Sequence, residues 1–190
     1  MLPYLAKPIP IAFLYNNIES FFDFLYRAET TALPRHKYVA NRQYSKGDRG
    51  LLSLGPTKLV FASAPIPHAG YVREHLGFTG TEYAHPANPS PWLSLDVLQE
   101  PPLLDRLVAY AGPGRTLQLV AYATTPQFLQ LVDKLRTDCG LTVLLPESPR
   151  PGCEWVRDHI DTKSGFRSLA SRWLSNAEEL LPQRRKTLPR

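Results

Sequence analysis

The feature of this sequence that most constrains its fold is the regular alternation of apolar runs and amphipathic helical runs between residues 57 and 146. The strand-like runs are residues 57–65, 81–89, 115–125 and 141–148, and the helical runs are residues 67–77, 103–112 and 126–140. Parallel strands need crossover connections, and the crossover helices bury both faces of the sheet. The alternation therefore predicts an α/β fold, a Rossmann-like parallel sheet with helices on both faces.

The residues before this region are less regular. The apolar run 11–15 is suited to a first strand, and residues 18–33 have helical spacing that ends at Pro34. Residues 35–50 are polar and basic, and this composition predicts a loop.

The net charge of +5 is concentrated in two stretches. Four of the last seven residues are basic, and five basic residues lie between Pro34 and Gly50 beside one acid, Asp48. Such patches are typical of nucleic-acid or phosphate partners. No recognition-helix, zinc-finger or stacking motif accompanies them, so a solvated loop and tail are the simpler interpretation. We therefore do not expect nucleic acid to be the partner.

Cysteine usage and the apolar N-terminus bear on the compartment. Cys139 and Cys153 form neither a C-x-x-C pair nor a metal-ligand spacing. The N-terminal apolar stretch is interrupted by three prolines and a lysine, which argues against a signal peptide. No apolar run approaches the roughly 18 residues of a membrane span. We predict reduced thiols, no membrane contact and a cytoplasmic location.

The usual motifs of nucleotide and hydrolase sites are missing from the sequence. No G-x-G-x-x-G follows a strand, and neither a P-loop nor a G-x-S-x-G occurs. His68 and His75 are seven residues apart on one helical run, but no further ligands accompany them to indicate a metal. Glu74 and Glu82 do not mark an acid–base pair. These residues favour a binding or scaffolding domain with no catalytic residues and no metal of its own.

A further amphipathic helix is predicted near the C-terminus. Asp161 or Thr162 can cap its start. Apolar side chains then follow at i, i+3, i+4, i+7 and i+8, namely Phe166, Leu169, Ala170, Trp173 and Leu174.

Three segments resemble a known family. The segment "GDRGLLSLGPTKLVFASAPIPHAGYVREHLGF" resembles a strand–proline–helix unit ending in Y-V-x-x-x-L-G, and "VAYATTPQFLQLVDKL" resembles a later Y-x-x-T-P-x-x-x-x-L unit. The segment "DTKSGFRSLA" resembles an N-K-x-x-F-R-x-L-A helix. In this order the three are similar to the pre-ATP-grasp N-terminal domain of pheganomycin-type peptide ligases, within the ATP-grasp superfamily. The resemblance covers residues 45–173.

The resemblance implies a Rossmann-like domain over residues 1–150 and, over residues 151–190, a junction helix and basic tail that begin an ATP-grasp domain. Complete relatives use ATP and Mg²⁺ to join a carboxylate to an amine. Lys163 matches a position that often contacts nucleotide phosphate, although a solvated first-turn lysine is the simpler interpretation. The ATP-grasp lobes lie outside this sequence, so we expect the chain to be inactive alone. It would then be a domain of a larger ligase, or a split or truncated homologue.

Ligands of open α/β sheets bind beyond the carboxyl ends of the strands. The "SAPIPHAG" loop lies there, so Ser63 and His68 are candidate substrate contacts, with turn formation as the simpler role. We expect the partner to be ATP-grasp lobes, in the same or a separate chain, or a second copy of this chain. The main alternative is a stand-alone Rossmann-like binding or interaction module. A nucleotide-dependent oxidoreductase or transferase with an unusual glycine loop is a weaker one.

Overall fold

The computed structural model describes residues 8–19, 47–146, 148 and 165–172. The chain divides into two compact units, Met1–Ser148 and Pro149–Arg190. The first unit contains a sheet with its covering helices, and the described part of the second is a helix over residues 165–172.

The sheet of the first unit has five strands, all parallel, in the order β3-β2-β1-β4-β5. The strands are β1 (Ile11–Leu14), β2 (Thr57–Phe61), β3 (Gly80–Ala84), β4 (Thr116–Ala121) and β5 (Thr142–Leu144). The first strand lies at the centre, where Ala12 is opposite Leu59 of β2 and Leu119 of β4. The predicted parallel sheet is confirmed, and the apolar run near the N-terminus is its central strand.

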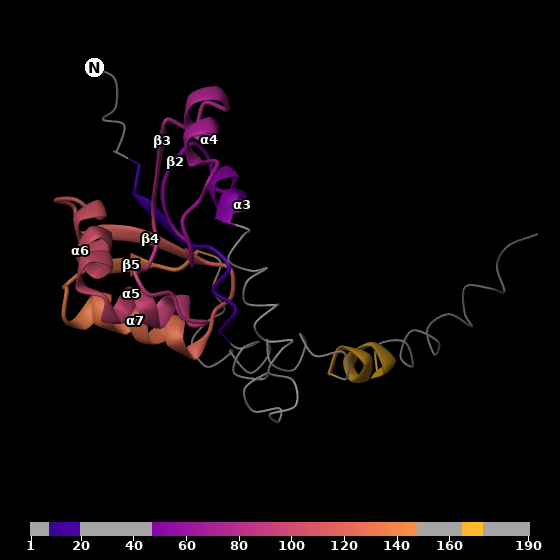
Figure 1. The fold of residues 1–190 in the computed structure, drawn as a ribbon. Coiled ribbons are helices and arrows are strands. Elements are labelled where there is room, and N and C mark those ends of the chain that lie inside the picture. Colours follow the sequence, from indigo (N-terminus) through magenta and orange to yellow (C-terminus); the bar gives the residue numbers. More distant parts are fainter. Residues whose placement is uncertain (1–7, 20–46, 147, 149–164, 173–190) are drawn as a thin grey trace, which may run out of the picture. The chain divides into compact units, whose positions relative to one another are not determined.

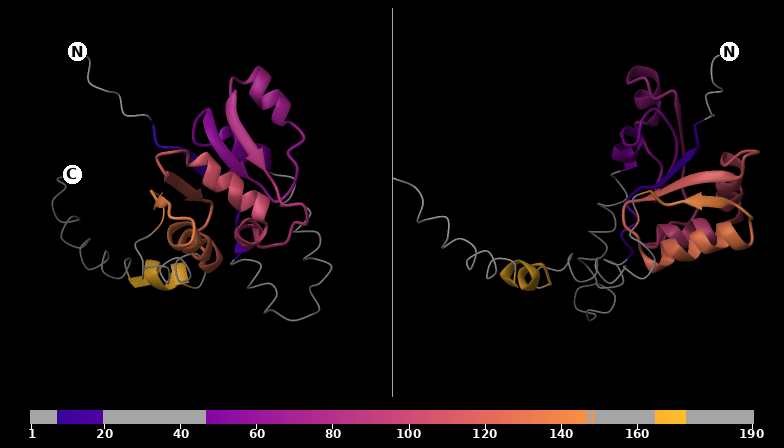
Figure 2. Two further views of the ribbon diagram at one scale, coloured as in Figure 1. Left: turned by 90° about the vertical axis from the view of Figure 1, so that its left-hand side faces the viewer. Right: turned by 180° about the vertical axis from the view of Figure 1, so that it is seen from behind.

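Helices cover the sheet on both faces, as predicted (Figures 1 and 2). On one face lie α3 (Gly47–Leu52) and α4 (Ala69–His75). On the other lie α5 (Leu93–Gln99), α6 (Pro101–Tyr110) and α7 (Pro126–Thr137). The last of these begins at Pro126, the residue that the sequence marks as its first position.

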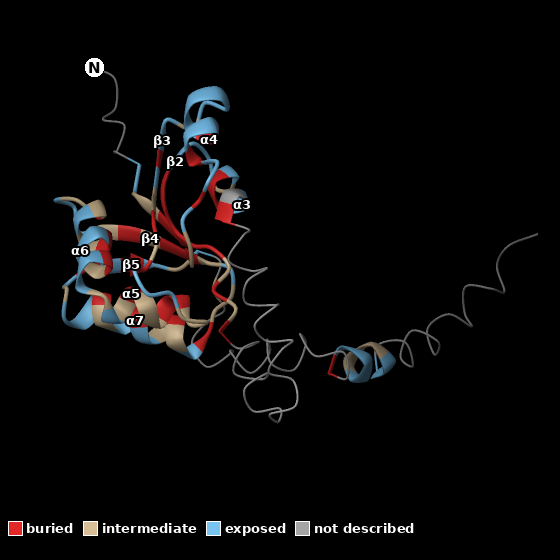
Figure 3. Ribbon diagram, viewed as in Figure 1, coloured by how far each residue is buried: buried red, intermediate tan, exposed pale blue. Residues whose placement is uncertain are grey.

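The sheet separates the core into two clusters because successive side chains of a strand point to opposite faces. In β1, Ala12 and Leu14 pack with α5, α6 and α7, whereas Phe13 lies on the side of α3 and α4. In β2, Leu59 and Val60 divide in the same way. Burial is therefore continuous along the central strands (Figure 3), as expected of a sheet covered on both sides.

The prediction of a loop over residues 35–50 is wrong for residues 47–50, which begin α3. A Cβ atom on Gly47 would lie 2.8 Å from Ile66 Cγ1, and one on Gly50 would lie 2.8 Å from Tyr15 Cγ. The helix therefore packs closer to the sheet than a larger residue permits. Tertiary packing, rather than helix propensity, accounts for these glycines.

The α5 helix has no counterpart in the sequence-based prediction. Its apolar pair, Leu93 and Val97, is fully buried and four residues apart, which is helical spacing. Two prolines follow Glu100 directly, and the helix predicted from the sequence begins after them, at Leu103. In the structure Pro101 is instead the first residue of α6, a position where its missing N–H is not needed.

In the second unit, residues 165–172 are helical, within the predicted amphipathic helix. Phe166 is 61% exposed, and Leu169 and Ala170 are half-buried. Trp173 and Leu174, which complete the predicted apolar face, lie outside the described residues, as do the predicted caps of this helix.

Candidate functional site

The candidate site lies at the carboxyl ends of β1 and β4. In the sheet, β1 lies between β2 and β4. The chain reaches β2 through α3 on one face of the sheet and reaches β4 through α5 and α6 on the opposite face. This is the point at which strand order reverses, where ligands of open α/β sheets bind. The residues that follow Leu14 and Ala121 therefore form the candidate site.

A buried asparagine joins the two loops. Asn17 Nδ2 donates to the carbonyl of Ala123 at 2.6 Å, and Asn17 Oδ1 accepts from the amide of Ala123 at 3.0 Å. The preceding residue, Asn16, has a φ of 67°, a left-handed conformation that asparagine tolerates better than most residues. This turn follows β1 and leads to Asn17.

A buried carboxylate lies next to this pair. Glu19 is fully buried, and its Oε1 accepts from the amide of Ser94 at 2.8 Å. Its Oε2 accepts from the Thr125 hydroxyl at 3.0 Å. The same hydroxyl accepts from the amide of Phe128 at 3.1 Å and so caps α7. The carboxylate is thus satisfied by an amide in the first turn of α5 and by the N-cap of α7.

This arrangement resembles anion binding at helix N-termini. First-turn N–H groups lack partners inside their own helix, and the helix dipole favours a negative charge there. In nucleotide-binding Rossmann folds the phosphate lies at the N-terminus of the helix that follows the first strand. Here the Glu19 carboxylate bonds to Ser94 in the first turn of α5, which follows β3, and to the N-cap of α7, which follows β4.

A second layer of the site lies on the α3 side of the sheet. Gly50 allows α3 to pack directly on Tyr15, and Arg49 precedes it with an exposed side chain. The rings of Tyr15 and Tyr122 meet edge to face, with their centroids 6.2 Å apart. Tyr15 is buried, whereas Tyr122 is 60% exposed. An exposed aromatic ring and a buried phenol therefore lie together at the ends of β4 and β1.

Burial raises the pKa of Tyr15, and the charge and hydrogen bond of Arg49 oppose this rise only in part. The neighbouring Tyr122 raises the pKa further. The Tyr15 hydroxyl is therefore protonated at neutral pH and remains a hydrogen-bond donor.

The far end of α3 is held by a buried lysine of β2. Lys58 Nζ donates to the carbonyls of Leu51 and Gly55, both at 2.6 Å, and lies 3.3 Å from Thr81 Oγ1. The ammonium also lies over the Phe78 ring, 4.8 Å from its centroid. Burial lowers the pKa of Lys58 to about 8. This contact fixes the helix that carries Arg49.

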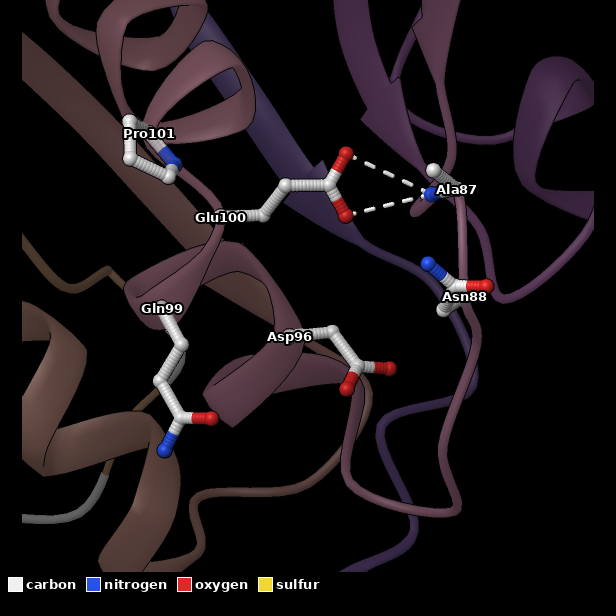
Figure 4. Close-up of a pocket in the computed structure, with 6 residues that line it drawn as sticks. All are labelled: Ala87, Asn88, Asp96, Gln99, Glu100 and Pro101. Carbon is white, nitrogen blue, oxygen red and sulfur yellow. Dashed lines mark hydrogen bonds between the residues drawn. The ribbon is translucent and has the colours of Figure 1, made fainter.

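A separate open pocket of about 360 Å³ lies between the loop after β3 and the junction of α5 and α6 (Figure 4). Both of its carboxylates already accept hydrogen bonds. Glu100 Oε2 accepts from the amide of Ala87 at 3.1 Å, and Asp96 accepts from the amide and hydroxyl of Ser90. Burial raises the pKa of Asp96, and the Ser90 hydrogen bonds oppose this. These hydrogen bonds hold the loop that lines the pocket, so its carboxylates serve the loop rather than converging on a ligand.

The residues singled out in the sequence lie elsewhere. Ser63 and His68 are both in the loop between β2 and α4, on the carboxyl side of the sheet as predicted; Ser63 is half-buried and His68 is exposed. His75 stacks on Tyr71, with 5.0 Å between ring centroids. Lys163 lies outside the described residues. A substrate contact by Ser63 or His68 stays a prediction.

The described residues form no site that fits ATP and Mg²⁺. The first turn of α5 and the N-cap of α7 are engaged by Glu19, and no glycine-rich loop follows β1. In the described part of the chain, no group of three or more His, Cys, Asp or Glu side chains could hold a metal ion. A nucleotide site would have to be supplied by other residues.

Sequence reasoning missed the residues that build the site. Asn17 and Glu19 bond to residues 75 to 106 positions away, and no local pattern shows such pairings. Thr125 carried a usable signal, since a threonine directly before a helix-opening proline is a good N-cap. Arg49 lay in the stretch interpreted as loop.

Comparisons with family models, curated proteins and solved structures find no match to this chain. Among the described residues, no helix has the length and apolar character needed to cross a membrane.

Proposed function

We propose that this chain is the non-catalytic N-terminal domain of an ATP-dependent carboxylate–amine ligase, and that it forms one wall of the substrate cleft. The observation that carries the proposal is the Glu19 carboxylate bonded to Ser94 N and Thr125 Oγ1. Because a buried side chain of the domain itself engages the first turn of α5 and the N-cap of α7, these groups are not available to a nucleotide, as expected of a domain that leaves ATP to the lobes that follow it.

The family resemblance supports this proposal at the site itself. The Y-x-x-T-P unit corresponds to Tyr122, Thr125 and Pro126. Tyr122 is exposed at the carboxyl edge, and Thr125 bonds to Glu19 and caps α7. The motif therefore combines a surface that can contact a ligand with the brace that holds it.

The test pairs the purified 190-residue chain with separately expressed ATP-grasp lobes of a pheganomycin-type ligase whose own N-terminal domain has been removed. We expect neither component alone to release ADP above background, and the mixture to release ADP only when carboxylate, amine and Mg²⁺ are all present. Mg²⁺-dependent ADP release by the 190-residue chain alone would contradict the proposal. So would a mixture no more active than the lobes.

A stand-alone binding module is the second candidate. One observation favours it: Tyr15, Arg49 and Tyr122 all belong to the compact unit Met1–Ser148. A ligand could therefore bind to them without any partner. In that case the chain binds its ligand but does not raise ADP release by the added lobes.

A further inference from the structure

We propose that the β3 edge of the sheet is an interface between two copies of this chain, in which the two β3 strands pair antiparallel about a two-fold axis at Tyr83. The two sheets then continue into one sheet of ten strands, five from each copy. A strand edge with unpaired backbone groups is a template for another strand, and two-fold symmetry is the commonest in soluble oligomers. This edge is a different part of the sheet from the candidate site, and the interface requires no ligase activity.

The two edge strands of the sheet are β3 and β5, and the edge of β5 is protected. The amide of Thr142 donates to the carbonyl of Arg115, so the backbone groups of Thr142 point to β4. Because this direction alternates along a strand, those of Val143 point outward. Arg136 Nη2 donates to the Val143 carbonyl at 2.8 Å. A side chain of α7 therefore covers the outer carbonyl of a strand of only three residues.

The edge of β3 is open. The carbonyl of Ala84 accepts from the amide of Ala62 at 3.0 Å, so the backbone groups of Ala84 point to β2. By the same alternation, those of Tyr83 and Thr81 point away from β2. The Thr81 N–H is engaged, since it donates to the carbonyl of Phe78 at 3.0 Å. Among the described residues, neither backbone group of Tyr83 and no group near the Thr81 carbonyl supplies the missing hydrogen bonds of this edge.

These unpaired groups suit a second copy of the same strand. In an antiparallel pair, two directly opposite residues exchange both of their backbone hydrogen bonds. With the axis at Tyr83, its N–H donates to the Tyr83 carbonyl of the second copy and its carbonyl accepts in return. The next pair matches the Thr81 carbonyl with the amide of His85, which has no acceptor among the described residues. The edge is therefore complementary to itself.

Neighbouring registers fit less well. An axis at Thr81 or at Glu82 would each need the Thr81 N–H, which is already bonded within the turn before β3. An axis at Glu82 would also place two carboxylates directly opposite each other, which is destabilising. An axis at Ala84 would match Thr81 with Ala87, whose amide donates to Glu100 at 3.1 Å. The backbone groups thus favour the axis at Tyr83.

The side chains agree with this register. Tyr83 is half-buried on the face covered by α3 and α4, and the axis brings the two Tyr83 rings together there. On the other face, Glu82 lies opposite Ala84 of the second copy. Arg106 also bonds to Glu82 at 3.1 Å, so each carboxylate approaches the interface with its own counter-ion. Pairing therefore brings together two aromatic rings and no unpaired charges.

The experiment measures the mass of the full chain by analytical ultracentrifugation from about 1 to 500 μM. We expect a monomer–dimer equilibrium with a Kd on the order of 10 μM, because the paired edge is smaller than a standard interface. Tyr83→Pro removes the outward N–H and leaves the bonds to β2, so the Kd should rise about tenfold or more. Tyr83→Val retains the N–H and loses the ring, and should raise the Kd only a few-fold.

The matched control is Arg136→Ala, which uncovers the opposite edge of the sheet. It should leave the Kd unchanged, because the proposed interface does not use β5. Tighter association of Arg136→Ala would place the contact at β5 and contradict the proposal.

Cysteine cross-links report the register and do not depend on the proline variant. Tyr83→Cys and Glu82→Cys are compared in a background of Cys139→Ser and Cys153→Ser under mild oxidation. The two copies of residue 83 are directly opposite, with Cα atoms about 5.5 Å apart, a separation that a disulfide spans. The two copies of residue 82 are diagonal neighbours, roughly 7–8 Å apart. We therefore expect a disulfide-linked dimer from Tyr83→Cys, and about tenfold slower linkage from Glu82→Cys.

Three further results would overturn the interface: a monomer at every concentration, a dimer as tight in Tyr83→Pro as in the unaltered chain, or faster linkage of Glu82→Cys than of Tyr83→Cys. Because these measurements contain no ATP-grasp lobes, they can fail while ADP release by the mixture succeeds. Failure of the interface is thus distinguishable from failure of the proposed function.

Discussion

Among the described residues of the first unit, two charged side chains, Glu19 and Lys58, are fully buried, and they are stabilised in different ways. Glu19 is bonded to groups 75 and 106 positions away, at the start of α5 and the N-cap of α7. Lys58 is bonded to two carbonyls within seven positions and to Thr81, 23 positions away. Neither forms an ion pair with another described residue.

The difference separates two roles. Glu19 closes long loops at the carboxyl edge and fills a position suited to a ligand anion, so it determines what cannot bind there. Lys58 braces a local turn beneath α3 and so determines where Arg49 is presented. A buried charge is costly unless hydrogen bonds replace its water, and both sites meet this need with neutral partners.

The largest effect is expected from Glu19→Ala. The substitution leaves the amide of Ser94 and the hydroxyl of Thr125 without their acceptor, and each buried unpaired group costs about 1–3 kcal/mol. We expect the free energy of unfolding to fall by about 3 kcal/mol in urea denaturation. Glu19→Gln retains one acceptor oxygen and should lose about half as much. A loss below about 0.5 kcal/mol for Glu19→Ala would remove the distinction between the two charges, since that is the range of ordinary surface changes.

A smaller effect is expected from Lys58→Met. The carbonyls of Leu51 and Gly55 lose their donor, but the cost of burying an ammonium disappears with it. The net loss should be about 1 kcal/mol. Arg106→Gln, which removes only an exposed ion pair, is the control and should change stability by less than about 0.5 kcal/mol. A Lys58→Met variant as unstable as Glu19→Ala would contradict the local role.

The smallest effect concerns pH. Burial lowers the pKa of Lys58 from 10.5 to about 8, so the folded chain releases this proton before the unfolded chain does. Between these values the unfolded state binds more protons, and stability rises with pH. After allowance for solvent screening, we expect unfolding free energy to rise by about 0.5–1 kcal/mol from pH 7 to pH 9, relative to Lys58→Met. Equal pH profiles for the two proteins would show that the lysine remains fully charged.

The sequence predicted the elements better than the site. Apolar runs and the pair Pro126 and Gly140 located the strands and α7, because these signals are local. The polar and basic composition of the residues before Leu51 suggested a loop, since the packing of Gly47 against Ile66 and of Gly50 against Tyr15 is visible only in three dimensions. The partners of Glu19 are distant in the chain for the same reason.

The most direct test of the account is an amide NMR titration of the full chain with ATP and Mg²⁺. If Glu19 occupies the anion-binding groups at the starts of α5 and α7, ATP should leave the amides of Ser94 and Phe128 unshifted. Saturable shifts of Ser94 and Phe128 on addition of ATP would show that a nucleotide reaches the helix N-termini, and would contradict the account.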